Sequence, residues 1–351
     1  MRKPNVVVVG TSFGVRVHVP ALRAAGFHVV ALVGTDQERT ERRAAKAGVD
    51  WATTDLVSVF DAVEAVTIAT PPASHRMLAL TAIRAGKHVI CEKPFTLRAT
   101  AAAELAAAAE RARVTALVGH EFRWAPDRAV LGKAIADGRI GEPRLATLVQ
   151  YVPFVADPAV RMPGWWFDRE AGGGWLGASG SHVIDQVRVW LGEFAGVSAS
   201  VRVVSQREVS ADDSFSVRAR LVNGCDVVMQ QTSGAFGPMT GMTRVAGSRG
   251  TVWLEGGHTW LADATGTHEL EVPPSLRLPV APAPSDDPMH AYTHLELGPY
   301  TRLCEVLRAG VEGRAHTSAV PVPTFADAVF DMRVLDAIRA SAAAGGARVG
   351  V

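Results

Sequence analysis

The sequence lacks the features that would direct it to a membrane, a metal or a nucleic acid. Its three cysteines are far apart in 351 residues and form no Cys-x-x-Cys or Cys/His spacing, so we expect buried thiols, a reducing compartment and no metal site. They are Cys91, Cys225 and Cys304. The formal net charge is only +1 and no block of Lys and Arg occurs, which argues against a nucleic-acid surface. No apolar run reaches the ~18 residues that a membrane helix needs.

The start of the chain leaves no room for a signal peptide, because a strand is predicted at once, over residues 5–9. We therefore expect a cytoplasmic protein. The chain is longer than an ordinary single domain, so we expect two domains.

The first third of the sequence alternates between short apolar runs and helical segments. Residues 6–9 are four consecutive valines, which is typical of a parallel strand buried on both faces. The expected strands are residues 5–9, 28–33, 65–69, 88–90 and 115–118, and the expected helices are 15–25, 37–47, 74–85 and 98–111. Strands joined by helices of this length give right-handed crossovers and a doubly wound parallel sheet.

A glycine-containing loop follows the first strand, where a dinucleotide would bind. The start of a helix offers free N–H groups and partial positive charge to a pyrophosphate. The usual G-x-G-x-x-G pattern is incomplete, because Ser12 takes the second glycine position and Val15 the third. The position between strand and helix still predicts a cofactor site. Its candidate residues are Gly10, Thr11, Ser12, Phe13 and Gly14.

The end of the second strand bears on the choice between NAD and NADP. An acidic residue there would bind the ribose 2′-hydroxyl of NAD, but Gly34 occupies that place. Thr35 follows, and the next helix carries Arg39 and two further arginines, which suit a 2′-phosphate. We therefore expect NADP in preference to NAD. The alternative is that Asp36 caps this helix and the arginines form a solvated face.

Lys93 is the first candidate for catalysis. It lies in the segment Cys91-Glu92-Lys93-Pro94, directly after the strand predicted at residues 88–90. In open α/β sheets, ligands bind beyond the carboxyl ends of the strands. Pro94 fixes the backbone beside the lysine. The alternative is a solvated loop lysine before a turn.

His182 is the second candidate. A glycine-rich segment, residues 172–180, leads into a helix that carries this histidine near its start. Imidazole titrates near neutral pH and can exchange a proton with a hydroxyl group. Asp185 lies one helical turn further on and could orient the ring. The alternative is a histidine with a purely structural role.

Four segments of the chain together resemble the Gfo/Idh/MocA oxidoreductase family, in that family's order and spacing. They are residues 10–22 (GTSFGVRVHVPAL), 70–75 (TPPASH), 86–89 (GKHV) and 92–94 (EKP). The resemblance covers essentially the whole chain. It implies a Rossmann domain at residues 1–121 and an α/β substrate and oligomerisation domain at residues 122–351, with a large, open, mostly antiparallel sheet. It also implies that the last helix, about 325–344, packs back near the first domain.

The resemblance also implies roles for particular residues. Thr70, Pro71 and His75 would line the cofactor, and Glu92 and Lys93 would flank the nicotinamide ribose and the substrate hydroxyl. The expected substrates are sugars, cyclitols or related polyols, or their keto forms. The expected substrate-binding residues are Glu121, Arg123, Trp165, Trp166, Ser181, His182 and Asp185.

The sequence departs from the family pattern at two places. Most members have an aspartate four residues before the histidine, where this chain has Ala178. The proton relay must therefore be rebuilt or simplified. The family's Trp-Arg pair is replaced by Trp165-Trp166, and these rings, with Trp175, could stack on a substrate or only fill the packing.

The second domain is expected to contain mainly strands. Their alternation of apolar and polar residues fits an antiparallel sheet with one wet face. The expected strands are residues 145–151, 197–204, 213–222, 226–232, 242–246 and 251–255. The expected helices are 126–137, 291–309 and 325–344, with a long proline-rich loop at 272–288.

These features predict an NAD(P)-dependent oxidoreductase that transfers a hydride between nicotinamide and a secondary alcohol or ketone. The Lys93 ammonium and the His182 imidazole would converge on the same reacting carbon. The alternative is an NAD(P)-binding sensor or complex subunit without dehydrogenase activity. We expect a homodimer or homotetramer formed through the open sheet, and no nucleic-acid or membrane partner.

Overall fold

The computed structural model describes residues 2–279, 282–283, 285 and 292–351. The described chain forms two compact units, which we treat separately. The first contains residues up to Thr96, then Thr100–Ala125 and Leu278–Val329; the second contains Leu97–Ala99, Pro126–Arg277 and Phe330–Val351. The first unit runs to Ala125, four residues beyond the predicted boundary, and it also includes the late segment Leu278–Val329.

The first unit contains a six-stranded sheet in the order β3-β2-β1-β4-β5-β6, in which all neighbouring strands are parallel. The strands are β1 (Asn5–Val9), β2 (His28–Val33), β3 (Trp51–Thr53), β4 (Ala65–Ile68), β5 (His88–Cys91) and β6 (Ala116–Val118). The predicted doubly wound sheet is confirmed. Strand β3 was not predicted, because it is short and its edge residue Trp51 is exposed.

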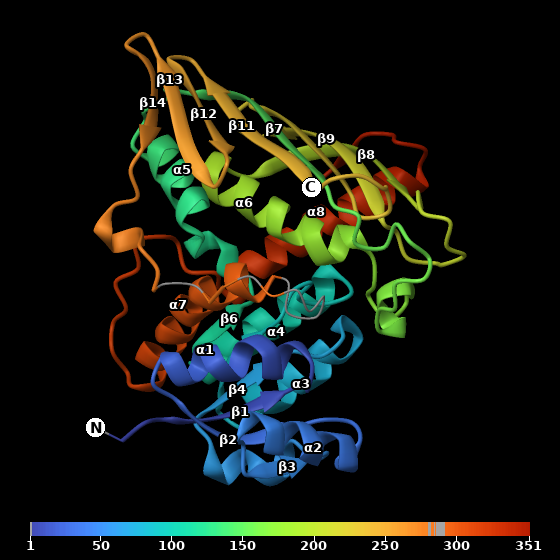
Figure 1. The fold of residues 1–351 in the computed structure, drawn as a ribbon, viewed down its shortest axis with the longest axis vertical. Helices are drawn as coiled ribbons and strands as arrows, with labels where there is room; N and C mark the ends of the chain where they lie inside the picture. Colours follow the sequence, from blue (N-terminus) through green and yellow to red (C-terminus); the bar gives the residue numbers. More distant parts are fainter. Residues whose placement is uncertain (1, 280–281, 284, 286–291) are drawn as a thin grey trace. The chain divides into compact units, whose positions relative to one another are not determined.

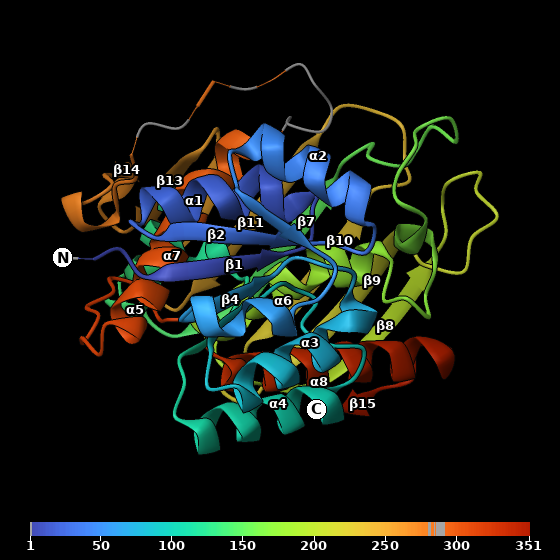
Figure 2. The ribbon, with the colours of Figure 1, turned by 90° about the horizontal axis from the view of Figure 1, so that it is seen from below.

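Helices cover both faces of this sheet. They are α1 (Val19–Ala24), α2 (Gln37–Ala47), α3 (Pro72–Arg84), α4 (Ala99–Ala112) and α7 (Thr293–Val311). Figure 2 shows α1 and α2 on one side of strands β1, β2 and β4, with α3 and α4 on the other side. Helix α3 starts two residues before its predicted start, since Pro72 suits the first helical position.

Helix α7 joins the first unit through the hydrophobic core. Its residues Tyr300, Leu303 and Leu307 are completely buried in the cluster that contains Leu22 of α1. The prediction for this helix was residues 291–309, and residue 291 lies outside the described residues. So does part of the loop predicted at 272–288.

The second unit contains a nine-stranded sheet in the order β14-β13-β12-β11-β7-β10-β9-β8-β15. The strands are β7 (Pro143–Tyr151), β8 (Phe194–Arg202), β9 (Ser214–Leu221), β10 (Asp226–Thr232), β11 (Thr240–Gly247), β12 (Gly250–Glu255), β13 (His258–Asp263), β14 (Gly266–Leu270) and β15 (Val349–Gly350). Strands β7 and β10 are parallel, whereas the other neighbouring pairs of this sheet are antiparallel. The predicted mostly antiparallel sheet is confirmed.

One face of this sheet packs against helices. These are α5 (Pro126–Ala136), α6 (Ser181–Leu191) and the part of α8 (Phe325–Ala343) that follows Val329. Figure 1 shows the strands extending across these helices on one side. The burial of β9 alternates residue by residue, as expected for a strand with one face in the core and one in solvent.

No helix in the part of the chain that the structure describes combines the length and apolar character needed to cross a bilayer.

Candidate active-site residues

The glycine loop of the first unit runs close against the end of β4. Gly10 has φ +110°, and a Cβ atom there would lie 2.2 Å from the main-chain oxygen of Ala69. A Cβ on Gly14 would lie 2.8 Å from a methyl group of Val8. Residues 14–18 form a π-helical turn that leads into α1. The two glycines therefore keep the close backbone approach that a pyrophosphate site requires, although the motif is incomplete.

The end of β2 cannot accept a side chain at Gly34. A Cβ there would lie 2.1 Å from Oγ1 of Thr40 and 2.9 Å from Cγ2 of Thr11. This packing explains why the acidic residue that binds a ribose 2′-hydroxyl in many such sites is missing.

The neighbouring arginines have different partners. Asp36 caps α2 by accepting a hydrogen bond of 2.8 Å from the Arg39 main-chain N–H, as the alternative interpretation expected. The Arg39 guanidinium donates to Oγ1 of Thr35 at 3.1 Å, and both side chains are exposed. Arg43 instead donates to the main-chain oxygen and Oγ1 of Thr11, at 2.9 and 2.7 Å. The side chains of Thr35 and Arg39 are therefore accessible to solvent just after the end of β2.

Glu92 is buried and accepts several hydrogen bonds. Its Oε1 accepts from the Tyr300 hydroxyl at 2.9 Å and lies 3.2 Å from Nε2 of His18. Its Oε2 accepts from the main-chain N–H of Lys93 at 3.3 Å. Burial acts to raise the pKa of Glu92, but the hydrogen bond and charge from His18, with the Lys93 charge, outweigh it. The pKa therefore lies below its usual value, and an ionised carboxylate adjoins Lys93.

An aromatic stack holds the two partners of Glu92. The rings of His18 and Tyr300 are stacked at 4.5 Å, and Phe13 meets His18 edge-on at 5.5 Å. Sequence reasoning missed both His18 and Tyr300. They lie 74 and 208 residues from Glu92, and no spacing pattern signals contacts at such separations.

His75 holds two loops together instead of facing solvent. It is completely buried, and its Nε2 lies 2.7 Å from the Thr70 main-chain oxygen while Nδ1 lies 3.2 Å from that of Phe95. Burial lowers the pKa of His75, against the opposing effect of these hydrogen bonds and of Glu92. The histidine thus ties the segment at the end of β4 to the segment after Lys93.

Two predicted substrate residues lie just after β6. Glu121 is almost completely buried at 2% exposure. The Arg123 guanidinium donates to the main-chain oxygen of Pro321 at 3.2 Å and lies 3.5 Å from the Asp327 carboxylate. These contacts join Arg123 to Pro321 and to Asp327 in the first turn of α8, all within the first unit.

In the second unit, the glycine-rich turn is shaped by close contacts. A Cβ on Gly173 would lie 2.2 Å from the main-chain oxygen of Trp165. Gly174 has φ +110°, and a Cβ there would lie 2.4 Å from Oδ1 of Asp212. Asp212 accepts a hydrogen bond of 2.7 Å from the Leu176 main-chain N–H, at the start of the helical segment. Burial raises the pKa of Asp212 to about 6, although the Leu176 bond opposes the shift.

Ser181, His182 and Asp185 lie together on α6 and are all buried. The preceding residues, Leu176–Gly180, form a π-helical segment, a distortion that often occurs at functional sites. Ala178 lies in this segment. Its neighbour Ser179 donates a hydrogen bond of 2.7 Å to Oε1 of Gln231.

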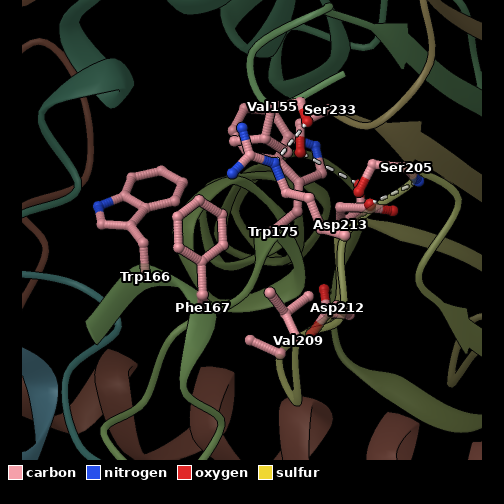
Figure 3. Close-up of a pocket in the computed structure, with 11 residues that line it drawn as sticks. Val155, Trp166, Phe167, Trp175, Ser205, Val209, Asp212, Asp213 and Ser233 are labelled. Carbon is pink, nitrogen blue, oxygen red and sulfur yellow. Dashed lines mark hydrogen bonds between the residues drawn. The ribbon is translucent and has the colours of Figure 1, made fainter. Parts of the chain in front are cut away.

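The tryptophans of the second unit pack against one another. The rings of Trp165 and Trp166 are 5.7 Å apart, and those of Trp166 and Trp175 are 6.4 Å apart. Figure 3 shows Trp166 and Trp175 beside a cavity that also borders Asp212. The cavity volume is about 10 Å³, which fits one water molecule and excludes a sugar.

Each unit thus collects part of the predicted set. In the first, residues 10–14, Thr70 and Lys93 all follow the carboxyl ends of parallel strands. In the second, the buried polar residues sit on α6. A doubly wound sheet with a glycine loop and a lysine at the same sheet edge is the arrangement expected of a dinucleotide-binding oxidoreductase.

Comparison with known proteins agrees with this class. Residues 4–120 match the oxidoreductase family with an NAD-binding Rossmann fold, and residues 129–253 match the GFO/IDH/MocA C-terminal domain. An uncharacterized oxidoreductase of Synechocystis sp. is 31% identical over 272 residues, covering 72% of each chain. The chain belongs to the Gfo/Idh/MocA family and is an oxidoreductase that acts on CH–OH groups.

Several relatives are sugar dehydrogenases. D-Apiose dehydrogenase of Paraburkholderia graminis is 29% identical over 259 residues, covering 70% of this chain and 66% of that protein. A solved structure of levoglucosan dehydrogenase, in complex with NADH and L-sorbose, matches with a TM-score of 0.85 at 25% identity. The match covers 100% of this chain and 99% of that chain.

Proposed function

We propose that this protein is an NAD(P)-dependent dehydrogenase that interconverts a secondary alcohol and a ketone of a sugar, cyclitol or related polyol. The observation that carries the proposal is Lys93, placed after β5 beside the buried, ionised Glu92 in an NAD-binding fold. The substrate class rests on relatives named as sugar dehydrogenases.

The first unit supplies the proposed cofactor site. Residues 10–14 would bind the pyrophosphate at the start of the helix, because two glycines there leave the backbone open. Thr70 and Pro71 would line the nicotinamide half, with His75 fixing their loop from behind. When bound, the dinucleotide supplies the group that gives or takes the hydride.

We propose NADP as the preferred cofactor. The exposed pair Thr35 and Arg39 follows β2, where a 2′-phosphate would lie. A guanidinium binds phosphate through two parallel hydrogen bonds, and Gly34 leaves no carboxylate to repel it.

Lys93 and His182 are the proposed acid–base groups. The Lys93 ammonium would lower the energy of the alkoxide that develops on the substrate, an effect worth ~3 kcal/mol by analogy with oxyanion donors. His182 would carry the hydroxyl proton to or from solvent, with Asp185 orienting its ring. The proposed substrate contacts are Ser181, Glu121, Arg123, Trp165 and Trp166. Of these, Arg123 already has partners within the protein, in Pro321 and Asp327.

We further propose a homodimer or homotetramer in the cytoplasm, formed through the open face of the nine-stranded sheet. Three large apolar side chains on central strands of that sheet support this assembly, because they are 40–51% exposed. They are Leu145, Val228 and Met242.

The test follows NADPH and NADH absorbance with a panel of keto-sugars and polyols. We expect turnover in the wild type, and its loss in Lys93→Ala and His182→Ala with cofactor binding retained. Lys87→Ala, on the loop before β5, is the matched control and should keep full activity. Cofactor binding with no turnover across the panel would instead support a sensor or complex subunit.

A further inference from the structure

A second buried carboxylate, that of Glu121, follows the strand next to β5 and interacts electrostatically with Glu92 and Lys93. Strands β5 and β6 pair in parallel with Cys91 opposite Val118, so the segments that follow them run side by side. Gly119 donates a main-chain hydrogen bond of 2.9 Å to Cys91. A Cβ at Gly119 would lie 2.5 Å from Oε1 of Glu92, so the main chain after β6 passes close to the Glu92 carboxylate. Two residues beyond Gly119 comes Glu121.

The surroundings of Glu121 differ from those of Glu92. Its side chain is 2% exposed, and its Oε2 has no hydrogen-bond partner among the described residues of the first unit. Glu92, in contrast, receives hydrogen bonds from Tyr300 and from the Lys93 main chain, and lies beside His18. The two carboxylates at this sheet edge therefore differ in how fully their oxygens are hydrogen-bonded.

The charges that face Glu121 come from two elements. Glu92 and Lys93 follow β5, and Glu296 and Tyr300 lie on α7. Burial raises the pKa of Glu121 well above its usual value, and the charges of Glu92 and Glu296 add to this, whereas Lys93 opposes it. A pair of carboxyl groups whose proton affinities are pushed apart is a common arrangement for acid–base work.

We propose that Glu121 is the group that exchanges a proton with Lys93 during turnover. Glu121 acts through the lysine and is a positioning and proton-storing residue. The proposal rests on the proposed dehydrogenase function and deepens it by assigning the proton of the substrate hydroxyl group to Lys93 and Glu121, in place of the route through His182.

The transfer balances in both directions. In ketone reduction, an N–H bond of the Lys93 ammonium breaks and an O–H bond forms on the substrate oxygen. The Glu121 carboxylic acid then gives its proton to the neutral amine, which restores the ammonium beside a new carboxylate. Solvent reprotonates Glu121 before the next cycle. Alcohol oxidation runs through the same steps in reverse.

The test compares Glu121→Gln with the wild type in the direction of ketone reduction. The amide keeps the size of the side chain but holds no exchangeable acid proton, so we expect kcat to fall ~10²-fold, the lower range for loss of an acid–base group. The wild-type kcat should fall as the pH rises and Glu121 loses its proton. This decrease of kcat on the alkaline side of the pH profile should be absent in Glu121→Gln. NADPH affinity, measured by fluorescence titration, should change less than about twofold.

Infrared difference spectroscopy gives a readout that does not depend on activity. The wild type should show a carboxylic-acid C=O band that persists at neutral pH and disappears in Glu121→Gln. The control is Glu110→Gln, the same substitution at an exposed position of α4. It should leave the band, kcat and the pH profile unchanged.

The outcomes separate this inference from the proposed function. If the wild type turns over no substrate but still shows the carboxylic-acid band, the dehydrogenase proposal is overturned. The protonated state of Glu121 would then serve something other than this reaction. An active wild type whose Glu121→Gln variant keeps both kcat and the alkaline limb would overturn the proton exchange alone.

Discussion

Replacing Asp212 by asparagine will change the way in which the stability of the protein depends on pH. Asp212 adjoins the glycine-rich turn before α6 and accepts a hydrogen bond from Leu176 at 2.7 Å. Asparagine has nearly the same shape, and its side-chain oxygen can accept the same bond. The substitution therefore removes a titrating group while it retains the main contact.

The magnitude follows from the shift in pKa. Burial raises the pKa of Asp212 from 3.8 to about 6, so the folded state holds this proton more tightly than the unfolded state. This tighter proton binding contributes to the free energy of unfolding. The contribution is fully present below pH 3.8 and is lost as the pH rises through 6. The total loss is ~3 kcal/mol in the free energy of unfolding, at about 1.4 kcal/mol per pKa unit. About half of it falls between pH 5 and 8.

The assay is urea unfolding at a series of pH values, followed by tryptophan fluorescence. The difference between Asp212→Asn and the wild type should grow in favour of the variant as pH rises from 5 to 8. Asp50→Asn, at an exposed position of the first unit, should give a curve parallel to that of the wild type. Parallel curves for Asp212→Asn as well would refute the claim that this carboxylate is ionised at a cost in the folded protein.

Three further predictions concern the first unit. Tyr300→Phe removes a donor to a buried carboxylate and should lower the free energy of unfolding by ~1.5–3 kcal/mol in urea titrations. Gly10→Ala places a Cβ 2.2 Å from a carbonyl oxygen and should abolish binding of either dinucleotide in fluorescence titrations. Gly86→Ala, also at positive φ but with no atom within 4 Å, should cost only about 1 kcal/mol and leave binding intact. Arg39→Ala should weaken NADPH binding ~10-fold and NADH binding little. The control Arg42→Ala should change the affinity for neither cofactor. Equal losses of NADPH and NADH affinity in Arg39→Ala would contradict the NADP preference.

The fold could be predicted from the sequence where local pattern and burial agree. The valine run predicted β1, and the alternating run at residues 226–232 predicted β10, both with their observed limits. Strands β3, β13, β14 and β15 were missed, since they lie at or near sheet edges and are short or rich in polar residues. Edge strands depend on pairing with a neighbour, which the sequence does not reveal.

The candidate site was predictable where a residue type and a strand end coincide, as for Lys93. It was not predictable where function depends on contacts between distant segments. Asp212 accepts a hydrogen bond from the main-chain N–H of Leu176, which is 36 residues away in the sequence. Tyr300 donates a hydrogen bond to Glu92, which is 208 residues away. His75, which the resemblance expects to line the cofactor, is buried and contacts the main chain of Thr70 and Phe95. In each case the residue was visible in the sequence but its partner was not.

The opposite environments of Glu92 and Glu121 have a consequence for cofactor binding. With Glu92 ionised, Lys93 charged and Glu121 protonated, the three side chains carry no net charge at the sheet edge where a pyrophosphate would bind. If Glu121 also ionised, a buried negative charge would remain near the phosphates, and such a charge is poorly screened by salt. Oε2 of Glu121 has no hydrogen-bond partner among the described residues, which favours the neutral acid, while the donors around Glu92 keep one carboxylate available to balance the lysine.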